Sequence, residues 1–317
     1  MSEPSLIVRR ATDDDLPAAI AVASLALRWR GDEPHEAFFR WKHIDNPAGR
    51  SPMWLACLGD EVVGFRTMLR WPFLSASDRA ISAVRAVDTA THPDHRRKGV
   101  FRLLTMAAVE ALNGEGVQFV FNTPNPSSRS GYLTMGWRDE GRVPTVVAPA
   151  RPSGIVRTVR AHGPARKWSE PCPAGAAVPA VVDDLADLAR TLPGGHVRTA
   201  RTVEHLSWRY GFEPLCYRVL RTDDAAAVIR LRQRGPALEV VVAELLSPSR
   251  RAALGVIRRI RREVTADHIL LTAHGSGRRP PVPPIPGLGP ILTVRPLAGP
   301  APSADAMRLD LGDLELL

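Results

Sequence analysis

Cysteine is scarce in this chain of 317 residues. Its three cysteines, Cys57, Cys172 and Cys216, lie far apart, and none belongs to a Cys-x-x-Cys or Cys/His spacing. This excludes a disulfide framework and a cysteine-ligated metal site as organising features of the fold. We therefore expect reduced thiols, most of them buried, and no bound metal.

Long apolar runs are also missing. No stretch approaches the roughly 20 consecutive apolar residues that a membrane-spanning helix requires. The first residues are polar and acidic, unlike the charged and then apolar leader of a secreted protein. We expect a cytoplasmic protein that has no membrane partner.

Basic residues are in excess, with 42 Lys and Arg against 33 Asp and Glu, which gives a formal net charge of +9. Such a balance can indicate a polyanionic partner. The arginines, however, are spread along the whole chain, and no basic stretch is interleaved with aromatic residues as in RNA-binding strands. We do not expect nucleic-acid binding, which salt-dependent retention on DNA would reveal.

The length and the apolar content, 44% of residues, are sufficient for two ordinary hydrophobic cores. A segment rich in Pro, Gly, Arg and Ala, without clear periodicity, separates the two halves of the chain. We expect a first domain at residues 1–148, a linker at 149–180 and a second domain at 181–317.

The first half alternates apolar patterns of two periods. Period-two or short buried runs predict strands at 6–9, 53–58, 62–71, 81–91 and 117–121, with a further strand from Trp137. Helical periodicity with capping residues predicts helices at 13–27, 35–42, 100 to about 113, and 127–135. This order predicts a mixed α/β fold with a mixed sheet.

The junction at residues 88–101 carries the clearest chemical signal. The expected strand ends in a basic turn, Arg96-Arg97-Lys98-Gly99, which opens an apolar helix. Backbone N–H groups that converge at a helix start bind anions, and a glycine lets the backbone approach a phosphate closely. A basic turn at a helix start is often only solvated, so the turn alone leaves both interpretations open.

Two motifs together resemble the GNAT superfamily of acyl-CoA N-acyltransferases, over about residues 5–150. The first motif is similar to the family's acyl-CoA motif: a strand is followed by x-Pro, two residues and Arg-x-x-Gly-x-x. Phe101 replaces a small residue of that motif. About 30 residues further on, the spacing of the second family motif is kept, with Ser128 and Gly131 in place of Ala and Leu. The residues at its offsets are Asn125, Ser128, Gly131, Tyr132, Gly136 and Trp137.

The resemblance implies transfer of an acetyl group from acetyl-CoA, as cosubstrate, to a primary amine of a small molecule or peptide in a direct ternary complex. The resemblance implies that Tyr132 is the general acid for the departing thiolate. It also implies that a backbone N–H of the strand around Thr89–Thr91 polarises the thioester carbonyl. The edge strands of such folds permit a homodimer. The residues expected to contact acetyl-CoA are Thr89, Ala90, Thr91, Arg96, Arg97, Lys98, Gly99, Val100, Phe101, Asn125 and Ser128.

The proton acceptor is less defined. Asp88 lies on the strand before the loop and either takes the ammonium proton, directly or through water, or makes a structural hydrogen bond; the sequence leaves both open. For the alternatives Glu61, His35, His43 and His92 a surface or turn position is favoured. Arg66 and Arg70 on the hairpin strand are placed, as a hypothesis, beside the acceptor cleft.

The second half begins with an echo of residues 38–56 at 205–219, which suggests an internal duplication. Its loop Ser247-Pro248-Ser249 lacks a glycine at the required offset, so we expect a degenerate GNAT-like copy that does not bind CoA. A non-catalytic acyl-CoA-binding or scaffold protein on the same fold is the alternative function, against which the intact Tyr132 spacing argues.

Overall fold

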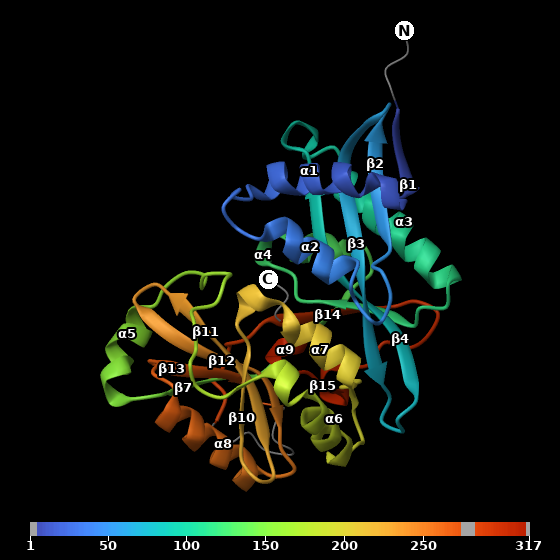
Figure 1. The fold of residues 1–317 in the computed structure, drawn as a ribbon. Coiled ribbons are helices and arrows are strands. Elements are labelled where there is room, and N and C mark those ends of the chain that lie inside the picture. The colour runs from blue at the N-terminus through green and yellow to red at the C-terminus, as the bar shows by residue number, and fades with distance from the viewer. Residues whose placement is uncertain (1–4, 274–282, 315–317) are drawn as a thin grey trace. The chain divides into compact units, whose positions relative to one another are not determined.

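The structure, a computed structural model, describes residues 5–273 and 283–314 (Figure 1). The chain divides into two compact units. Unit 1 comprises Met1–Phe73, Ala80–Glu140 and Leu292–Pro302, and unit 2 comprises Leu74–Arg79, Gly141–Ile291 and Ser303–Leu317. Both units therefore contain segments that are distant in the sequence.

Unit 1 is built on a mixed sheet. Its strands lie in the order β1 (Leu6–Arg10), β2 (Met53–Leu58), β3 (Glu61–Leu74), β4 (Ala80–Thr91), β5 (Phe119–Asn122), β14 (Ile291–Pro296) and β6 (Arg138–Arg142). The β1–β2 and β2–β3 pairs are antiparallel, β4 and β5 are parallel, and β14 is antiparallel to β5. The expected mixed α/β fold is confirmed.

Both faces of this sheet bury apolar side chains. Successive residues of a strand point to opposite faces, so Trp54 packs in one core and Leu55 in the other. The first core includes Leu104 of α3 and Tyr132 of α4, and the second includes Phe39 of α2. The helices of unit 1 are η1 (Asp13–Asp15), α1 (Leu16–Leu27), α2 (His35–His43), η2 (Pro93–His95), α3 (Val100–Gly114) and α4 (Pro126–Thr134).

The parallel strands β4 and β5 separate toward their carboxyl ends. They pair only from Ala83 opposite Phe119 to Arg85 opposite Phe121. Further along β4, Asp88 has a left-handed φ of 37°, which interrupts the regular strand. Residues 89–91 consequently lie beyond the last pair with β5.

Unit 2 contains a second mixed sheet. Its order is β7 (Thr145–Pro149), β13 (His268–Thr272), β12 (Ala237–Leu246), β11 (Ala226–Arg234), β10 (Arg218–Arg221) and β8 (Ala176–Ala177), with β12 and β13 parallel. The short strands β9 (Val197–Thr199) and β15 (Met307–Arg308) pair in parallel and do not belong to this second sheet. The helices are η3 (Pro152–Gly154), α5 (Ile155–Arg160), η4 (Val178–Ala180), α6 (Val182–Thr191), α7 (Val203–Gly211), η5 (Glu213–Leu215), α8 (Arg250–Glu263), η6 (Ala304–Ala306) and α9 (Leu311–Leu314).

The division into units differs from the expected domain boundaries. The main segment of unit 2 begins at Gly141, and within it β7 pairs with β13 from Thr145 opposite Thr272 to Pro149 opposite His268. The segment 149–180, expected as a linker, contains α5 and β8. The strand β14 pairs with β5, so unit 1 also takes up residues from the expected second domain.

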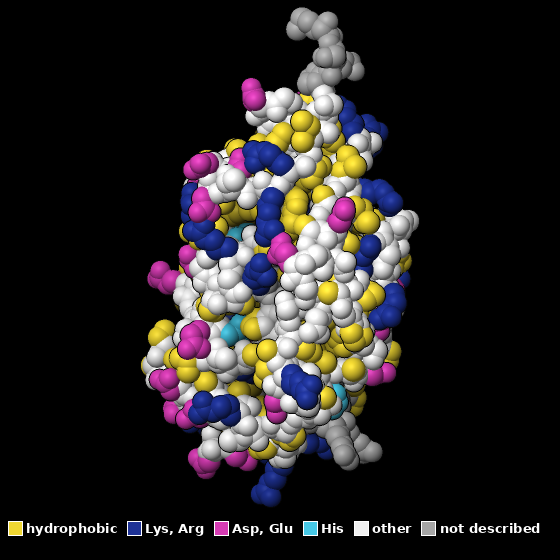
Figure 2. All heavy atoms as spheres, turned by 90° about the vertical axis from the view of Figure 1, so that its right-hand side faces the viewer, with side chains coloured by type: hydrophobic (Ala, Val, Ile, Leu, Met, Phe, Trp, Pro, Cys, Tyr) yellow, Lys and Arg dark blue, Asp and Glu magenta, His cyan; other side chains and the backbone are white. Residues whose placement is uncertain are grey.

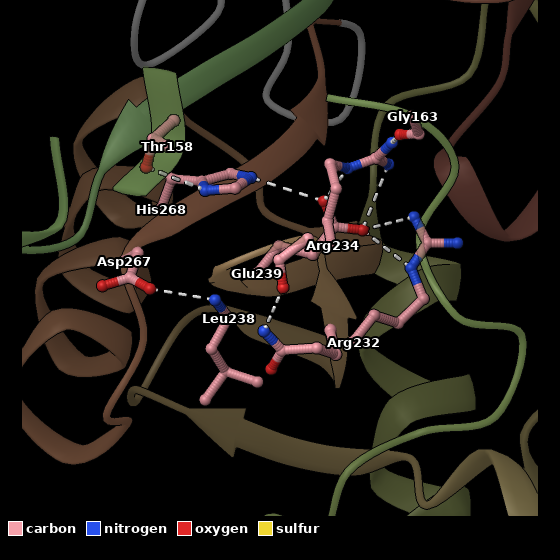
Figure 3. Close-up of polar contacts among 10 residues, drawn as sticks. Thr158, Gly163, Arg232, Arg234, Leu238, Glu239, Asp267 and His268 are labelled. Carbon is pink, nitrogen blue, oxygen red and sulfur yellow. Dashed lines mark hydrogen bonds and ion pairs between the residues drawn. The ribbon is translucent and has the colours of Figure 1, made fainter. Parts of the chain in front are cut away.

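A buried polar network joins the central strands of unit 2 (Figure 3). Glu239 of β12 is fully buried and accepts hydrogen bonds from Arg232 Nε at 2.8 Å and Arg234 Nε at 2.7 Å. His268 Nε2 of β13 lies 3.4 Å from its carboxylate, and His268 Nδ1 lies 3.1 Å from Thr158 Oγ1 of α5. Burial alone would raise the pKa of Glu239, but these partners lower it to about 2. The ionised carboxylate therefore ties three strands together.

The excess of basic residues does not form one continuous surface on the face shown in Figure 2. Lys and Arg side chains there alternate with acidic and apolar ones. On α8, the arginine-rich helix of unit 2, Arg259 and Arg262 both bind Glu263. None of the helices in the described part of the chain is long and apolar enough to cross a membrane.

Candidate active site

The loop between β4 and α3 has the backbone shape of an anion site. Arg97 and Gly99 both have left-handed φ values, 63° and 78°. Gly99 is the N-cap residue of α3, and no side chain caps this helix start. A Cβ at Gly99 would meet nothing within 4 Å. The first N–H groups of α3 are thus available to a ligand that approaches from the open side.

A cavity of about 490 Å³ adjoins this loop. Of the residues expected to contact acetyl-CoA, the cavity is lined by Thr89, Ala90, Thr91, Arg96, Arg97, Gly99, Val100 and Phe101. Arg96 Nη2 donates to the Ala26 carbonyl oxygen at the end of α1, at 3.2 Å. The exposed Arg97 and Lys98 side chains form no hydrogen bond or ion pair with another described residue. Two cations are therefore free to meet phosphates, and the residues fit a pyrophosphate.

Asn125 begins the helix that carries the candidate general acid. Its Oδ1 accepts from Ser128 N at 2.9 Å, Ser128 Oγ at 2.9 Å and Ser127 Oγ at 2.7 Å. Asn125 is therefore the N-cap of α4, and Ser128 supports the cap. The Asn125 amide nitrogen makes no hydrogen bond with another described residue, so it remains available to a ligand.

Tyr132 is buried, and its hydroxyl is held by a buried arginine. Arg66 Nη2 of β3 donates to Tyr132 Oη at 2.6 Å, and the Arg66 side chain is fully buried. The guanidinium carbon lies 5.3 Å from the Tyr132 ring centroid and 5.6 Å from that of Phe101. Arg66 was placed, as a hypothesis, beside the acceptor cleft; in the structure its guanidinium contacts Tyr132 of α4 and Phe101 of α3.

Two of the three departures from the family motifs, Phe101 and Gly131, compensate each other. Phe101 lies at the start of α3, and Gly131 lies one residue before Tyr132 on α4. A Cβ at Gly131 would lie 3.3 Å from Phe101 Cε1, so the ring takes up the space of a side chain at 131. The ring also packs edge-on against Tyr132, with centroids 5.4 Å apart. A large residue in the loop is therefore accommodated by a missing side chain on α4.

Asp88 is surrounded by basic residues of α2. Its carboxylate forms an ion pair with Lys42 and lies 2.7 Å from His43 Nε2, while His43 Nδ1 lies 2.9 Å from Ser51 Oγ. Burial would raise the pKa of Asp88, but Lys42 and His43 hold it far below its usual range. Burial lowers the pKa of His43. Asp88 is therefore an ionised, weakly basic carboxylate, and its hydrogen bonds are partly structural.

The other candidate residues have local contacts. His35 Nε2 pairs with Glu33 at 2.7 Å and stacks on a tryptophan, and His92 Nδ1 accepts from Asp94 N in the turn of η2. Glu61 is exposed at the start of β3. Arg70 Nη2 lies 3.6 Å from Glu115.

Gly64 is a site residue that the sequence analysis missed. A Cβ at this position of β3 would lie 2.9 Å from Val100 Cγ1 and 3.1 Å from the Ala90 carbonyl oxygen. Its missing side chain lets α3 begin directly against the sheet. An isolated glycine within a strand pattern is a known signal of such close approach.

Comparisons with known proteins agree with this architecture. Residues 7–139 match the model of the acetyltransferase (GNAT) domain family. A search of the curated proteins gave no match.

Three solved structures share the fold over most of the chain. A probable N-acyltransferase of unknown function from Enterococcus faecalis V583 matches with a TM-score of 0.67 and 10% identity, over 93% of this chain and 73% of that chain. A GCN5-related N-acetyltransferase from Kribbella flavida matches with a TM-score of 0.63 and 16% identity, over 93% of this chain and 72% of that chain. Eis1 from Mycobacterium abscessus matches with a TM-score of 0.58 and 15% identity, over 92% of this chain and 74% of that chain.

The family match over residues 7–139 supports an acyltransferase. Residues 7–139 belong to the GNAT acetyltransferase domain family. The likeness to solved structures extends into unit 2. A degenerate second GNAT copy stays a hypothesis, although β12, α8 and β13 repeat the parallel strand–helix–strand arrangement of β4, α3 and β5.

Proposed function

We propose that this protein transfers an acetyl group from acetyl-CoA to a primary amine of a small molecule or peptide, in a direct ternary complex. The observation that carries the proposal is the loop at Gly99. It combines left-handed residues, an uncapped helix start, an adjacent cavity and two cations that have no partner among the described residues. Phosphates are the ligands that this combination favours.

In this proposal the chain's own residues supply orientation and proton transfer. The loop and the start of α3 hold the CoA pyrophosphate, and Asn125 contributes a free amide donor. Backbone N–H groups of residues 89–91, beyond the last pair with β5, are placed to polarise the thioester carbonyl. Holding donor and acceptor side by side replaces a bimolecular encounter, which is the largest contribution asked of the site.

Tyr132 and Asp88 take the two proton-handling roles. Tyr132 is the candidate general acid for the sulfur that leaves. Asp88 remains ionised between Lys42 and His43, so we propose that it attracts and orients the acceptor ammonium, whose proton then passes to water. The acceptor itself carries a primary amine.

Calorimetric titration with acetyl-CoA tests the donor site. A Gly99→Asp variant adds a carboxylate where the pyrophosphate is expected, so binding at micromolar concentration should fall at least about tenfold. Gly116→Asp is the matched control, because Gly116 has a similar φ of 77° and nothing within 4 Å of its Cβ position, but it follows the other end of α3. Binding should survive in this control.

Two results would contradict the proposal. The first is that the unsubstituted protein does not bind acetyl-CoA; the second is that both aspartate variants weaken binding equally. Binding that is lost only in Gly99→Asp justifies a screen of primary amines, with release of the CoA thiol as the signal.

A further inference from the structure

Arg66 carries a buried positive charge that the described part of the chain does not neutralise. Its side chain is fully buried, and its Nε and Nη1 atoms have no hydrogen-bond partner. Its one hydrogen bond among residues 5–273 and 283–314 goes to the neutral hydroxyl of Tyr132, at 2.6 Å. A buried cation without a counter-charge is costly to fold, so negative charge that develops close to it would be stabilised.

The direction of this hydrogen bond constrains Tyr132. A guanidinium group can only donate, so Tyr132 Oη must be the acceptor. The hydroxyl's own hydrogen is then directed away from Arg66 and is free to be donated elsewhere. If Tyr132 gives up that hydrogen, the resulting negative oxygen is already paired with a guanidinium group.

The pair lies next to the loop cavity. The Phe101 ring lines that cavity, and it also contacts both members of the pair: its centroid lies 5.6 Å from the Arg66 guanidinium carbon and 5.4 Å from the Tyr132 ring centroid. Phe101 thus contacts the buried charge and also lines the cavity at the loop.

We propose that Arg66 is the positioning residue that aims the Tyr132 proton at the departing CoA sulfur and balances the negative charge that develops there. This inference rests on the proposed function. As the amine nitrogen bonds to the thioester carbon, the carbon–sulfur bond breaks and its electron pair goes to sulfur. The Tyr132 proton is transferred to the sulfur, which gives the CoA thiol. The tyrosine oxygen, held by Arg66, is then reprotonated by the proton that the amine released.

An Arg66→Met variant tests this role without an acceptor. The first readout is the ionisation of the thiol of bound CoA, followed by the ultraviolet absorbance of the thiolate as pH rises. The thiol should ionise at a lower pH in the unsubstituted protein than in free solution, and the variant should lose at least about a tenfold factor in that ionisation constant. Affinity for acetyl-CoA, whose sulfur carries no charge, should change by less than about threefold.

Thermal stability is the second readout. Methionine is close to arginine in length and removes an unpaired buried charge, so the variant's Tm should rise by roughly 2–6 °C. Arg66→Lys keeps the charge and should recover part of the thiol shift. The matched control is Arg230→Met in unit 2: Arg230 is also fully buried but donates to the Lys167 carbonyl oxygen at 3.3 Å. It should leave the thiol ionisation unchanged.

The outcomes separate the two proposals. If the unsubstituted protein does not bind acetyl-CoA, the proposed function fails. If acetyl-CoA binds but the thiol ionises identically with and without Arg66, the inference fails and the proposed function stands. A lower Tm together with an unchanged thiol would make Arg66 a structural link between β3 and α4.

Discussion

The packing of Phe101 against Gly131 gives a quantitative test of the site's architecture. A Cβ at Gly131 would lie 3.3 Å from Phe101 Cε1 and 3.9 Å from Cδ1, so the longer side chain of Gly131→Leu must collide with the ring. Overpacking of this kind costs about 1–3 kcal/mol, and replacing glycine inside a helix returns about 1 kcal/mol. We expect the single variant to be destabilised by about 0–2 kcal/mol.

The complementary change removes the ring. Phe101 is only partly buried, so Phe101→Ala should cost about 2–3 kcal/mol, less than the 3–5 kcal/mol typical of a fully buried phenylalanine. In the double variant the leucine enters the space that the ring vacated. The combined cost should therefore be smaller than the sum of the two single costs by about 1–3 kcal/mol.

Urea denaturation of the four proteins measures this coupling as a double-mutant cycle. Gly114→Leu, combined with Phe101→Ala, is the control pair, because Gly114 lies at the end of α3 and a Cβ there would meet nothing within 4 Å. Its effects should add. Additivity of the Gly131 pair within about 0.5 kcal/mol would refute the reasoning, since the two residues would then not share one space.

Two further predictions concern stability. Burial raises the pKa of Glu244, which lies beside Asp310 and Asp313, to about 7. Above pH 4.5 the folded state therefore keeps a proton on Glu244 that the unfolded state has released. The contribution of this proton to the free energy of unfolding is lost as pH rises toward 7. Relative to the unsubstituted protein, Glu244→Gln should therefore lose less of its free energy of unfolding as pH rises from 5 to 8. The comparison is needed because Asp310 and Asp313, whose pKa values burial raises to about 6, titrate in the same sense, and His205, whose pKa burial lowers to about 3, titrates in the opposite sense. An equal pH dependence of both proteins would contradict the prediction. Asn125→Ala removes the N-cap of α4 and should cost about 1 kcal/mol in urea denaturation, whereas no loss would show that α4 needs no cap.

The elements of unit 1 could be predicted because their signals are local. The periodicities of the sequence place α2, β2 and α3 within about two residues of their observed bounds. The assembly of the units could not be predicted in the same way. The strand β14 pairs with β5 across about 170 residues, and no periodicity within a single strand specifies its partner.

The same distinction applies to the candidate site. The loop at Gly99 and the helix that carries Tyr132 follow from short motifs of fixed spacing. The contact of Arg66 with Tyr132 joins residues 66 positions apart, and an arginine in an apolar strand gives no sign of its partner. The roles of Tyr132 and Asp88 in catalysis stay predictions, because the structure shows their contacts and not a reaction.

Two charges of opposite sign lie on neighbouring strands, and their surroundings differ. The carboxylate of Asp88 on β4 is partly exposed, forms an ion pair with Lys42 and contacts His43. Among the described residues, Arg66 on β3 hydrogen-bonds only to the neutral hydroxyl of Tyr132, and its guanidinium lies over the Tyr132 and Phe101 rings. A ligand that brings negative charge to the Tyr132 side of the sheet would offset the cost of the buried Arg66 charge. A leaving thiolate has that charge, and a neutral thioester does not, so Arg66 would favour the late part of the transfer over the bound starting complex.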